Sequence, residues 1–401
     1  MSAQQPSIQS SIHPLVFKVG DISSLPDPYI NTNDGIAVRT VTRALEGMQK
    51  EAIVHNGFTK TAWRMVCDEG PWLNGTDLSS FPLGFYSAGM AASLASEITA
   101  LAKQRNISVQ GLELIQDARY SMEGSAVKRT MRGTALPIET EIRIKSDAPK
   151  ADIQKLVFHS LAASPADAIM RSELESHFRI TRNDKDIGVG KAKLSTIPAA
   201  SDPKRLFDDV TPAEDTTLAE NIIEKQEGAD TAGDKVSGKP VGFVSDQKRM
   251  LQVRAVLRLR EDGLKTIQTQ CIQPSGGSVF NFLSDDSLAF GGQGRAPTGL
   301  DYISAGVSFC FMTQLSRFAG IVKQDLQSYG IVQDTSFSLP GSSAHRNKAA
   351  TAELVDTHVF LTSDDDDEAN RVLVDMGEQT CYLHACYRGV AKTRLRLRTT
   401  S

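Results

Sequence analysis

The sequence predicts an α+β fold of two tandem domains, each with an antiparallel sheet and a long central buried helix. Segments of alternating polar and apolar residues, typical of strands, flank two long apolar helical segments at 86–102 and 300–322. The chain also matches itself when shifted by 217 residues, so that the Ser-Ala-Gly triplet at 87–89 falls on the triplet at 304–306. Self-similarity at one offset over roughly a hundred residues indicates a duplicated unit.

The first domain is expected at 36–181, after an N-terminal arm at 1–35 without a core of its own. Strands are expected where polar and apolar residues alternate, and helices where apolar residues recur with helical spacing. Small residues such as Ala88 and Gly89 indicate that another element approaches the central helix closely. The expected elements are strands at 36–41 and 59–67, the central helix at 86–102, strands at 112–122 and 135–145, and a helix at 150–161.

Residues 182–245 are acidic, rich in Pro, Gly and Ala and poor in aromatics, which is typical of a linker, and we expect one short helix at 218–225. The second domain, 246–398, repeats the plan of the first. Its acidic run at 364–368 is interpreted as a helix start, where the helix dipole favours carboxylates, rather than as a metal site. The expected elements are strands at 253–259 and 264–272, a Gly-rich loop at 290–294, the helix at 300–322, strands at 331–339 and 352–361, and a helix from 364 to about 377.

Composition argues against several classes of protein. The chain is 40% hydrophobic and 23% charged, as in ordinary soluble proteins, and its net charge of −4 without a dense basic face gives no reason to expect a nucleic-acid partner. We find no apolar stretch of the ~20 residues that a membrane span needs, and no secretory signal. Five cysteines, an odd number, do not suggest a disulfide framework. We therefore expect a cytoplasmic protein without cofactor or metal.

Two cysteines carry the functional hypothesis. In the shifted register Cys310 faces Ser93 (310 − 93 = 217) and Cys381 faces Ser164 (381 − 164 = 217). Either cysteine alone would be a small buried hydrophobe, but their joint exchange for serine indicates two halves of one dithiol. We expect one working pocket around the cysteines, and a second around the serines that is inert or serves only in binding.

The stretch SDDSLAFGGQGRAPTGLDYISAGVSFCF (284–311), followed by a second cysteine past the next helix, resembles the osmotically inducible protein C / organic hydroperoxide resistance (OsmC/Ohr) superfamily. The resemblance implies a peroxiredoxin-like thiol peroxidase of oxidative stress. In it Cys310 attacks the O–O bond of a small hydrophobic hydroperoxide, Cys381 forms the disulfide, and an external dithiol reduces it. Single-domain members form intertwined homodimers, so we expect an intramolecular pseudo-dimer that possibly pairs again.

The resemblance also implies an arginine from the N-terminal strands that lowers the pKa of Cys310, held by an acid at the start of the cysteine helix. The best matches are Arg258, with Arg254 and Arg260 as alternatives, and Asp301. Gln314 and Arg317 follow Cys310 on the same helical face and are candidate pocket residues. The chain departs from the family pattern at Leu300, which occupies the usual acidic position, and after Cys381, where Tyr-Leu replaces Pro and a small residue.

Other functions remain open at this point. Cys310 could act as a covalent nucleophile of a catabolic or detoxification pathway without peroxide, or the chain could be a non-catalytic protein that binds a hydrophobic ligand. A zinc or iron site on Cys381, His384 and Cys386 would need a fourth ligand that the sequence does not offer. Cys67 and Cys271 fall on predicted strands and are interpreted as core residues.

Overall fold

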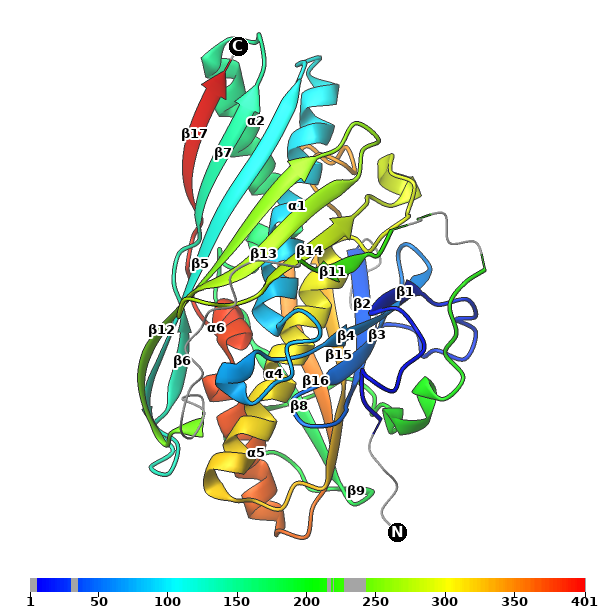
Figure 1. The fold of residues 1–401 in the computed structure, drawn as a ribbon, viewed down its shortest axis with the longest axis vertical. Helices are drawn as coiled ribbons and strands as arrows, with labels where there is room; N and C mark the ends of the chain where they lie inside the picture. The colour runs from blue at the N-terminus through cyan, green and yellow to red at the C-terminus, as the bar shows by residue number, and fades with distance from the viewer. Residues whose placement is uncertain (1–5, 30–34, 215–217, 219, 227–242, 401) are drawn as a thin grey trace.

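The computed structural model describes residues 6–29, 35–214, 218, 220–226 and 243–400. It confirms an α+β fold, built from two β-sheets (Figure 1). The first sheet has the order β1 (Val16–Lys18), β4 (Thr61–Cys67), β3 (Lys50–Asn56), β2 (Gly35–Ala44), β15 (Ser328–Ser338), β16 (Ala352–Thr362), β8 (Ser176–Arg182) and β10 (Lys193–Leu194), with β9 (Lys185–Asp186) beside β8. The second has the order β11 (Ile223–Lys225), β14 (Val279–Ser284), β13 (Lys265–Gln273), β12 (Asp246–Leu259), β5 (Gly111–Ser125), β7 (Glu139–Lys145) and β17 (Arg394–Thr400), with β6 (Arg132–Ala135) beside β5.

Two long helices, α1 (Pro82–Gln104) and α4 (Gly299–Val322), pack against each other in the middle of the molecule (Figure 1). Helix α1 lies on the second sheet and α4 on the first. The contact is close because it is made by glycines: a Cβ on Gly89 would lie 2.4 Å from the carbonyl oxygen of Gly299, and one on Gly306 would lie 2.8 Å from the backbone nitrogen of Tyr86. The prediction that small residues let another element approach this helix is confirmed.

Each sheet draws strands from both halves of the chain, which differs from the predicted pair of domains with one antiparallel sheet each. Strand β2 of the first half pairs with β15 of the second, and β12 of the second pairs with β5 of the first. The last strand of each half also crosses over, and it pairs in parallel: β8 with β16, and β17 with β7. Both sheets are therefore mixed, because each is completed by a strand that arrives from the other half.

Corresponding elements recur along the chain at a constant spacing. Helices α2 (Lys150–Ala163) and α5 (Asp367–Thr380) begin 217 residues apart (367 − 150 = 217), as do α1 and α4 (299 − 82 = 217). Strand pairing gives a spacing of 215 for β2 and β3, since Val41 lies between Ile53 and Val332 as Val256 lies between Gln268 and Ile115. The connection between β13 and β14 is correspondingly two residues longer than that between β3 and β4.

The predicted arm and linker do not remain apart from the body. They cover the outer face of the first sheet, where Phe17, Val19 and Leu25 of the arm and Phe207 of the linker pack on Val41, Ile53, Val332 and Phe360. The helix predicted at 218–225 is wrong for the residues described, because Ile223–Lys225 form strand β11, which pairs with β14. The remaining parts of the arm and linker, at 1–5, 30–34, 215–217, 219 and 227–242, lie outside the described residues.

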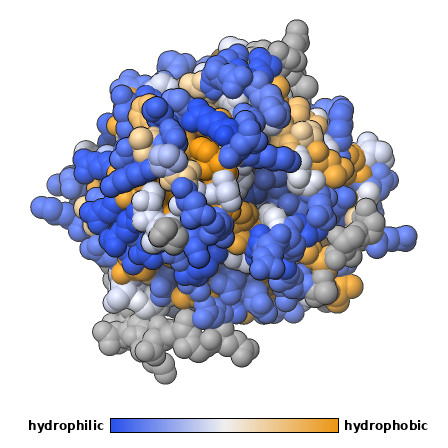
Figure 2. Space-filling view, turned by 90° about the horizontal axis from the view of Figure 1, so that it is seen from above, coloured by the Kyte–Doolittle hydropathy of each residue, from blue (hydrophilic) through white to orange (hydrophobic). Residues whose placement is uncertain are grey.

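The outer face of the second sheet carries charged pairs instead, among them Arg254 with Asp117 and Arg143 with Glu113. From the end that carries the C-terminus, the surface is largely hydrophilic and its apolar residues form separate patches (Figure 2). Helix α4 is the one described helix long and apolar enough to cross a membrane, and most of it is buried inside the protein.

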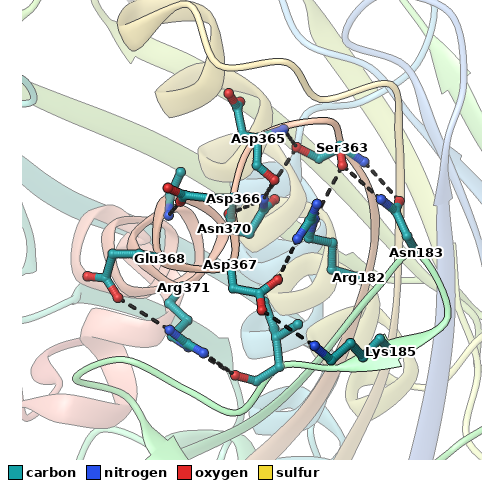
Figure 3. Close-up of polar contacts among 12 residues, drawn as sticks. Arg182, Asn183, Lys185, Ser363, Asp365, Asp366, Asp367, Glu368, Asn370 and Arg371 are labelled. Atoms are coloured by element: carbon teal, nitrogen blue, oxygen red, sulfur yellow. Dashed lines mark hydrogen bonds and ion pairs between the residues drawn. The ribbon is translucent and has the colours of Figure 1, made fainter.

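The acidic run at 364–368 is confirmed as a helix start. The carboxylate of Asp366 accepts a hydrogen bond from the backbone nitrogen of Ala369 at 2.8 Å and so caps α5. Asp367 forms ion pairs with Arg182 and Lys185 (Figure 3). These contacts tie α5 to the end of β8, and they neutralise the run without a metal ion.

The coverage of one outer face but not the other predicts unequal costs at two equivalent positions. Val41→Arg should lower the free energy of unfolding by about 3 kcal/mol or more, because the charge would be buried without a partner beneath the arm. Val256→Arg, on the uncovered face, should cost less than about 1 kcal/mol. Denaturant or thermal unfolding of the two variants measures this difference, and equal destabilisation would contradict the described packing.

Candidate functional site

The structure brings Cys310 and Cys381 together. Cys310 lies in the middle of α4, and Cys381 lies between α5 and α6 (Tyr382–Arg388), where its Sγ caps α6 by accepting a hydrogen bond from the backbone nitrogen of His384 at 3.4 Å. The two thiols are hydrogen-bond partners, and both side chains are almost fully buried. The backbone nitrogen of Leu383 also hydrogen-bonds to Cys310.

The equivalent serines have the same arrangement. Ser93 lies in the middle of α1, and Ser164 caps the short helix α3 (Pro165–Ala168) by accepting a hydrogen bond from the backbone nitrogen of Asp167 at 3.3 Å. The two hydroxyl oxygens are 2.9 Å apart. Both halves therefore bring one residue of the long helix against the cap of a following short helix, and only the second half places sulfur at both positions.

Burial controls the protonation of the pair. It raises the pKa of Cys310 well above the usual thiol value, and the neighbouring thiol of Cys381 raises it further, while the backbone nitrogen of Leu383 lowers it. Cys310 is therefore a protonated thiol at neutral pH in this conformation. Because the thiolate is the reactive form, reaction requires a rearrangement that brings in water or a cation.

Charged residues of the first half lie close to the pair. Burial disfavours the charge of Lys50, but the carboxylate of Glu69 and the thiol of Cys67 outweigh this effect and raise the pKa of Lys50. Burial also raises the pKa of Glu69, which accepts a hydrogen bond of 2.5 Å from Thr313 on α4. Glu69 is close enough to raise the pKa of Cys310, so this cluster links the first half to the cysteine helix.

The predicted pocket residues Gln314 and Arg317 lie together on α4. Gln314 Oε1 accepts a hydrogen bond of 3.0 Å from Arg317, whose guanidinium is buried. Burial and the positive charge of Arg249 lower the pKa of Arg317 to about 10. Arg249 in turn donates a hydrogen bond of 3.3 Å to the hydroxyl of Tyr382, the residue after Cys381. Two cations thus flank the start of α6 beside the thiols.

The other predicted site residues lie elsewhere. Arg258 points outward from the second sheet, is 63% exposed and forms an ion pair of 2.6 Å with Glu113. The alternatives Arg254 and Arg260 are paired with Asp117 and Glu220. Strand β12 alternates between its two faces, and Val253, Ala255 and Leu257 occupy the buried one, so arginines at the even positions 254, 258 and 260 face away from α4.

Asp301 does not reach Cys310 either. It is nine residues before Cys310, about 13 Å along a helix. Its carboxylate forms a capping box with Thr298 and accepts a hydrogen bond of 2.8 Å from the side chain of Asn56. Asp301 therefore begins α4 and ties it to β3.

Tyrosine hydroxyls surround the thiols. Tyr120 interacts electrostatically with Cys310, Cys381 and Cys386, and Tyr387 with Cys386. Both hydroxyls are buried and have no hydrogen-bond partner among the described residues. The phenol groups are therefore available to a molecule that enters beside the sulfurs.

The predicted metal alternative gains no geometric support. Burial lowers the pKa of His384 to about 4, so its ring is neutral, and the ring stacks 5.7 Å from Phe178. The thiol of Cys386 hydrogen-bonds to the carbonyl oxygen of Tyr382 at 3.5 Å. Among the residues that the structure describes, no three His, Cys, Asp or Glu side chains are grouped so that they could hold a metal ion.

Comparisons with known proteins add little. No family model matches the chain, and no curated protein matches it. One solved structure is similar, an OsmC-like hydroperoxide resistance protein from Jannaschia sp. CCS1, at 18% identity over 33% of this chain and 83% of that chain, with a TM-score of 0.20. A TM-score this low carries no functional conclusion, and the proposals below rest on the geometry of this chain.

Sequence reasoning missed Arg249, Glu69 and Tyr120. All three lie in segments that are remote in sequence from both cysteines, and they come near them only because β5 and β12 pair and because the loop after β4 meets α4. The one available signal was Tyr382, which directly follows Cys381.

The raised pKa of Cys310 predicts a pH profile. Labelling of Cys310 by iodoacetamide, followed by peptide mass spectrometry, should accelerate about tenfold per pH unit from pH 7 and continue to rise above pH 9, since the thiolate fraction grows in this way below the pKa. Circular dichroism at each pH checks that the fold persists. A rate that levels off below pH 8 would show a low-pKa thiol instead.

Proposed function

We propose that the chain is an OsmC-like thiol peroxidase that reduces organic hydroperoxides through Cys310 and Cys381. The observation that carries the proposal is the contact between two thiols from segments 71 residues apart (381 − 310 = 71). The equivalent serine pair supports it, because the same geometry without sulfur cannot perform redox chemistry.

The proposed cycle has three steps. The Cys310 thiolate attacks one oxygen of the hydroperoxide, the O–O bond breaks, and the alkoxide takes a proton and leaves as an alcohol, so that Cys310 becomes a sulfenic acid. The Cys381 thiol then displaces water from that sulfur and forms a disulfide. An external dithiol reduces the disulfide and restores both thiols, and is itself oxidised to a disulfide.

Several groups near the sulfurs support the chemistry. Arg249 and Arg317 supply positive charge that would stabilise a thiolate or alkoxide. The hydroxyls of Tyr120 and Tyr387 could hydrogen-bond to peroxide oxygens, and apolar neighbours such as Phe311 suit a hydrophobic substrate. Because both thiols are buried, we propose that the substrate enters through a local opening near α6.

We also propose that the chain is a tandem duplication of one OsmC-like domain that forms a pseudo-dimer with itself. The recurrence of elements at spacings of 215 and 217, and the exchange of β2 and β12 between halves, support this view. A reducing cytoplasm is the compartment that we propose, since all five cysteines are free thiols.

Thiol counting tests the peroxidase. One equivalent of cumene hydroperoxide should remove two free thiols per chain, and a small dithiol such as dithiothreitol should restore them. Cys310→Ser should abolish this loss, whereas Cys381→Ser should stop at a sulfenic acid that dimedone traps. A matched control is Cys271→Ser, on a strand of the second sheet, which should not alter the count of two.

Other outcomes would exclude the mechanism. Reaction that needs Cys310 but not Cys381, with an electrophile other than peroxide, would favour the covalent nucleophile. Indifference of every activity to both substitutions would favour a non-catalytic binding protein.

The serine pair predicts that a second dithiol can be built. In the double variant Ser93→Cys and Ser164→Cys, one further equivalent of oxidant should remove two additional thiols per chain, because the side chains already meet at 2.9 Å. Peptide mapping should find the new disulfide between positions 93 and 164. A folded variant whose new thiols both stay free after oxidation would contradict the equivalence of the two pairs.

A further inference from the structure

A cavity beside the serine pair has a built lining of its own. It holds about 460 Å³ of space, open to solvent, and both halves contribute to it. Ser93, Ser96 and Glu97 of α1 form one wall, and the start of α4 at Thr298–Leu300 forms another. The rings of Phe58 and Phe290, also in the lining, stack 5.1 Å apart. We call this cavity the serine pocket.

One polar group in the serine pocket awaits a partner. Ser287 lines the pocket and is only 6% exposed, yet its hydroxyl has no hydrogen-bond partner among the described residues. A buried hydroxyl left unpaired costs about 1–3 kcal/mol. A ligand that hydrogen-bonds to Ser287 Oγ would recover this cost.

The charge of the lining is negative. The titratable residues among those that line the serine pocket are Glu97 and Asp286, and no Lys, Arg or His is among them. Glu97 is held by the backbone nitrogens of Ser342 and Ser343, and burial raises its pKa. Asp286 is paired with Lys265 at 2.8 Å. The positive end of α4, which would attract an anion, is already neutralised by Asp301 in its capping box.

We propose that the serine pocket binds a small primary amine with an apolar or aromatic body. The ammonium group would lie between Glu97 and Asp286 and donate to Ser287 Oγ. The body would lie against Phe58 and Phe290, where an aromatic face also attracts a cation. This site is separate from the dithiol, so its occupation requires neither Cys310 nor the proposed peroxidase.

Three ligands of nearly equal size test the charge preference by isothermal titration calorimetry at pH 7: benzylamine, benzyl alcohol and benzoate. Benzylamine should bind at one saturable site, benzyl alcohol at least tenfold more weakly, and benzoate without detectable heat. Failure of benzylamine to saturate, or binding of benzoate as tight as that of benzylamine, would overturn the proposal.

Variants place the site. Glu97→Gln should weaken benzylamine binding about tenfold and Ser287→Ala about threefold, and Ser93→Leu should abolish it by filling the pocket. Cys310→Ser should leave it unchanged. Should Glu97→Gln unfold because it loosens Ser342 and Ser343, Ser287→Ala still decides. Unchanged affinity in Ser287→Ala, or loss of binding in Cys310→Ser, would place the amine elsewhere. Hydroperoxide consumption by Ser287→Ala, which is remote from the cysteines, distinguishes failure of this site from failure of the peroxidase.

Discussion

The architecture depends on the backbone contact between α1 and α4. Gly89 lies against Gly299, and Gly306 lies against Tyr86, at distances that no Cβ would permit. Because the helices touch at these points, the two sheets pack on opposite sides of one helix pair, and the start of α4 reaches Ser93. Any larger residue at Gly89 would separate the helices, and with them the walls of both candidate sites.

The two sheets solve different problems with the same framework. The first sheet presents Val41, Ile53 and Phe360 outward and needs the arm and linker to cover them. The second presents Gln268 and Arg143 at the positions equivalent to Ile53 and Phe360, and water covers it. Segments that have no counterpart in the repeat thus exist to bury apolar surface, which is a stabilising role that does not require chemistry of their own.

The dithiol combines protection with low reactivity. Burial keeps Cys310 protonated and shields it from oxidants, while Arg249 and Arg317 hold positive charge nearby without a direct contact to its sulfur among the printed interactions. A rearrangement of α6 would change both properties together, because Cys381 caps that helix and Tyr382 binds Arg249. The serine pocket has no such constraint, since hydroxyls need no activation in order to bind.

The sequence by itself determined the α+β class, the two long helices and the joint exchange of Cys310 and Cys381 for serine, because periodicity and internal repetition are local properties. It did not determine which half completes which sheet, since an edge strand can pair equally well with either copy. Arg258 and Asp301 were misplaced for this reason: a strand's inward face and a helix's distance from a site depend on partners remote in sequence. Only tertiary structure decided that Arg249, Glu69 and Tyr120 would surround the thiols, through pairings between segments more than a hundred residues apart.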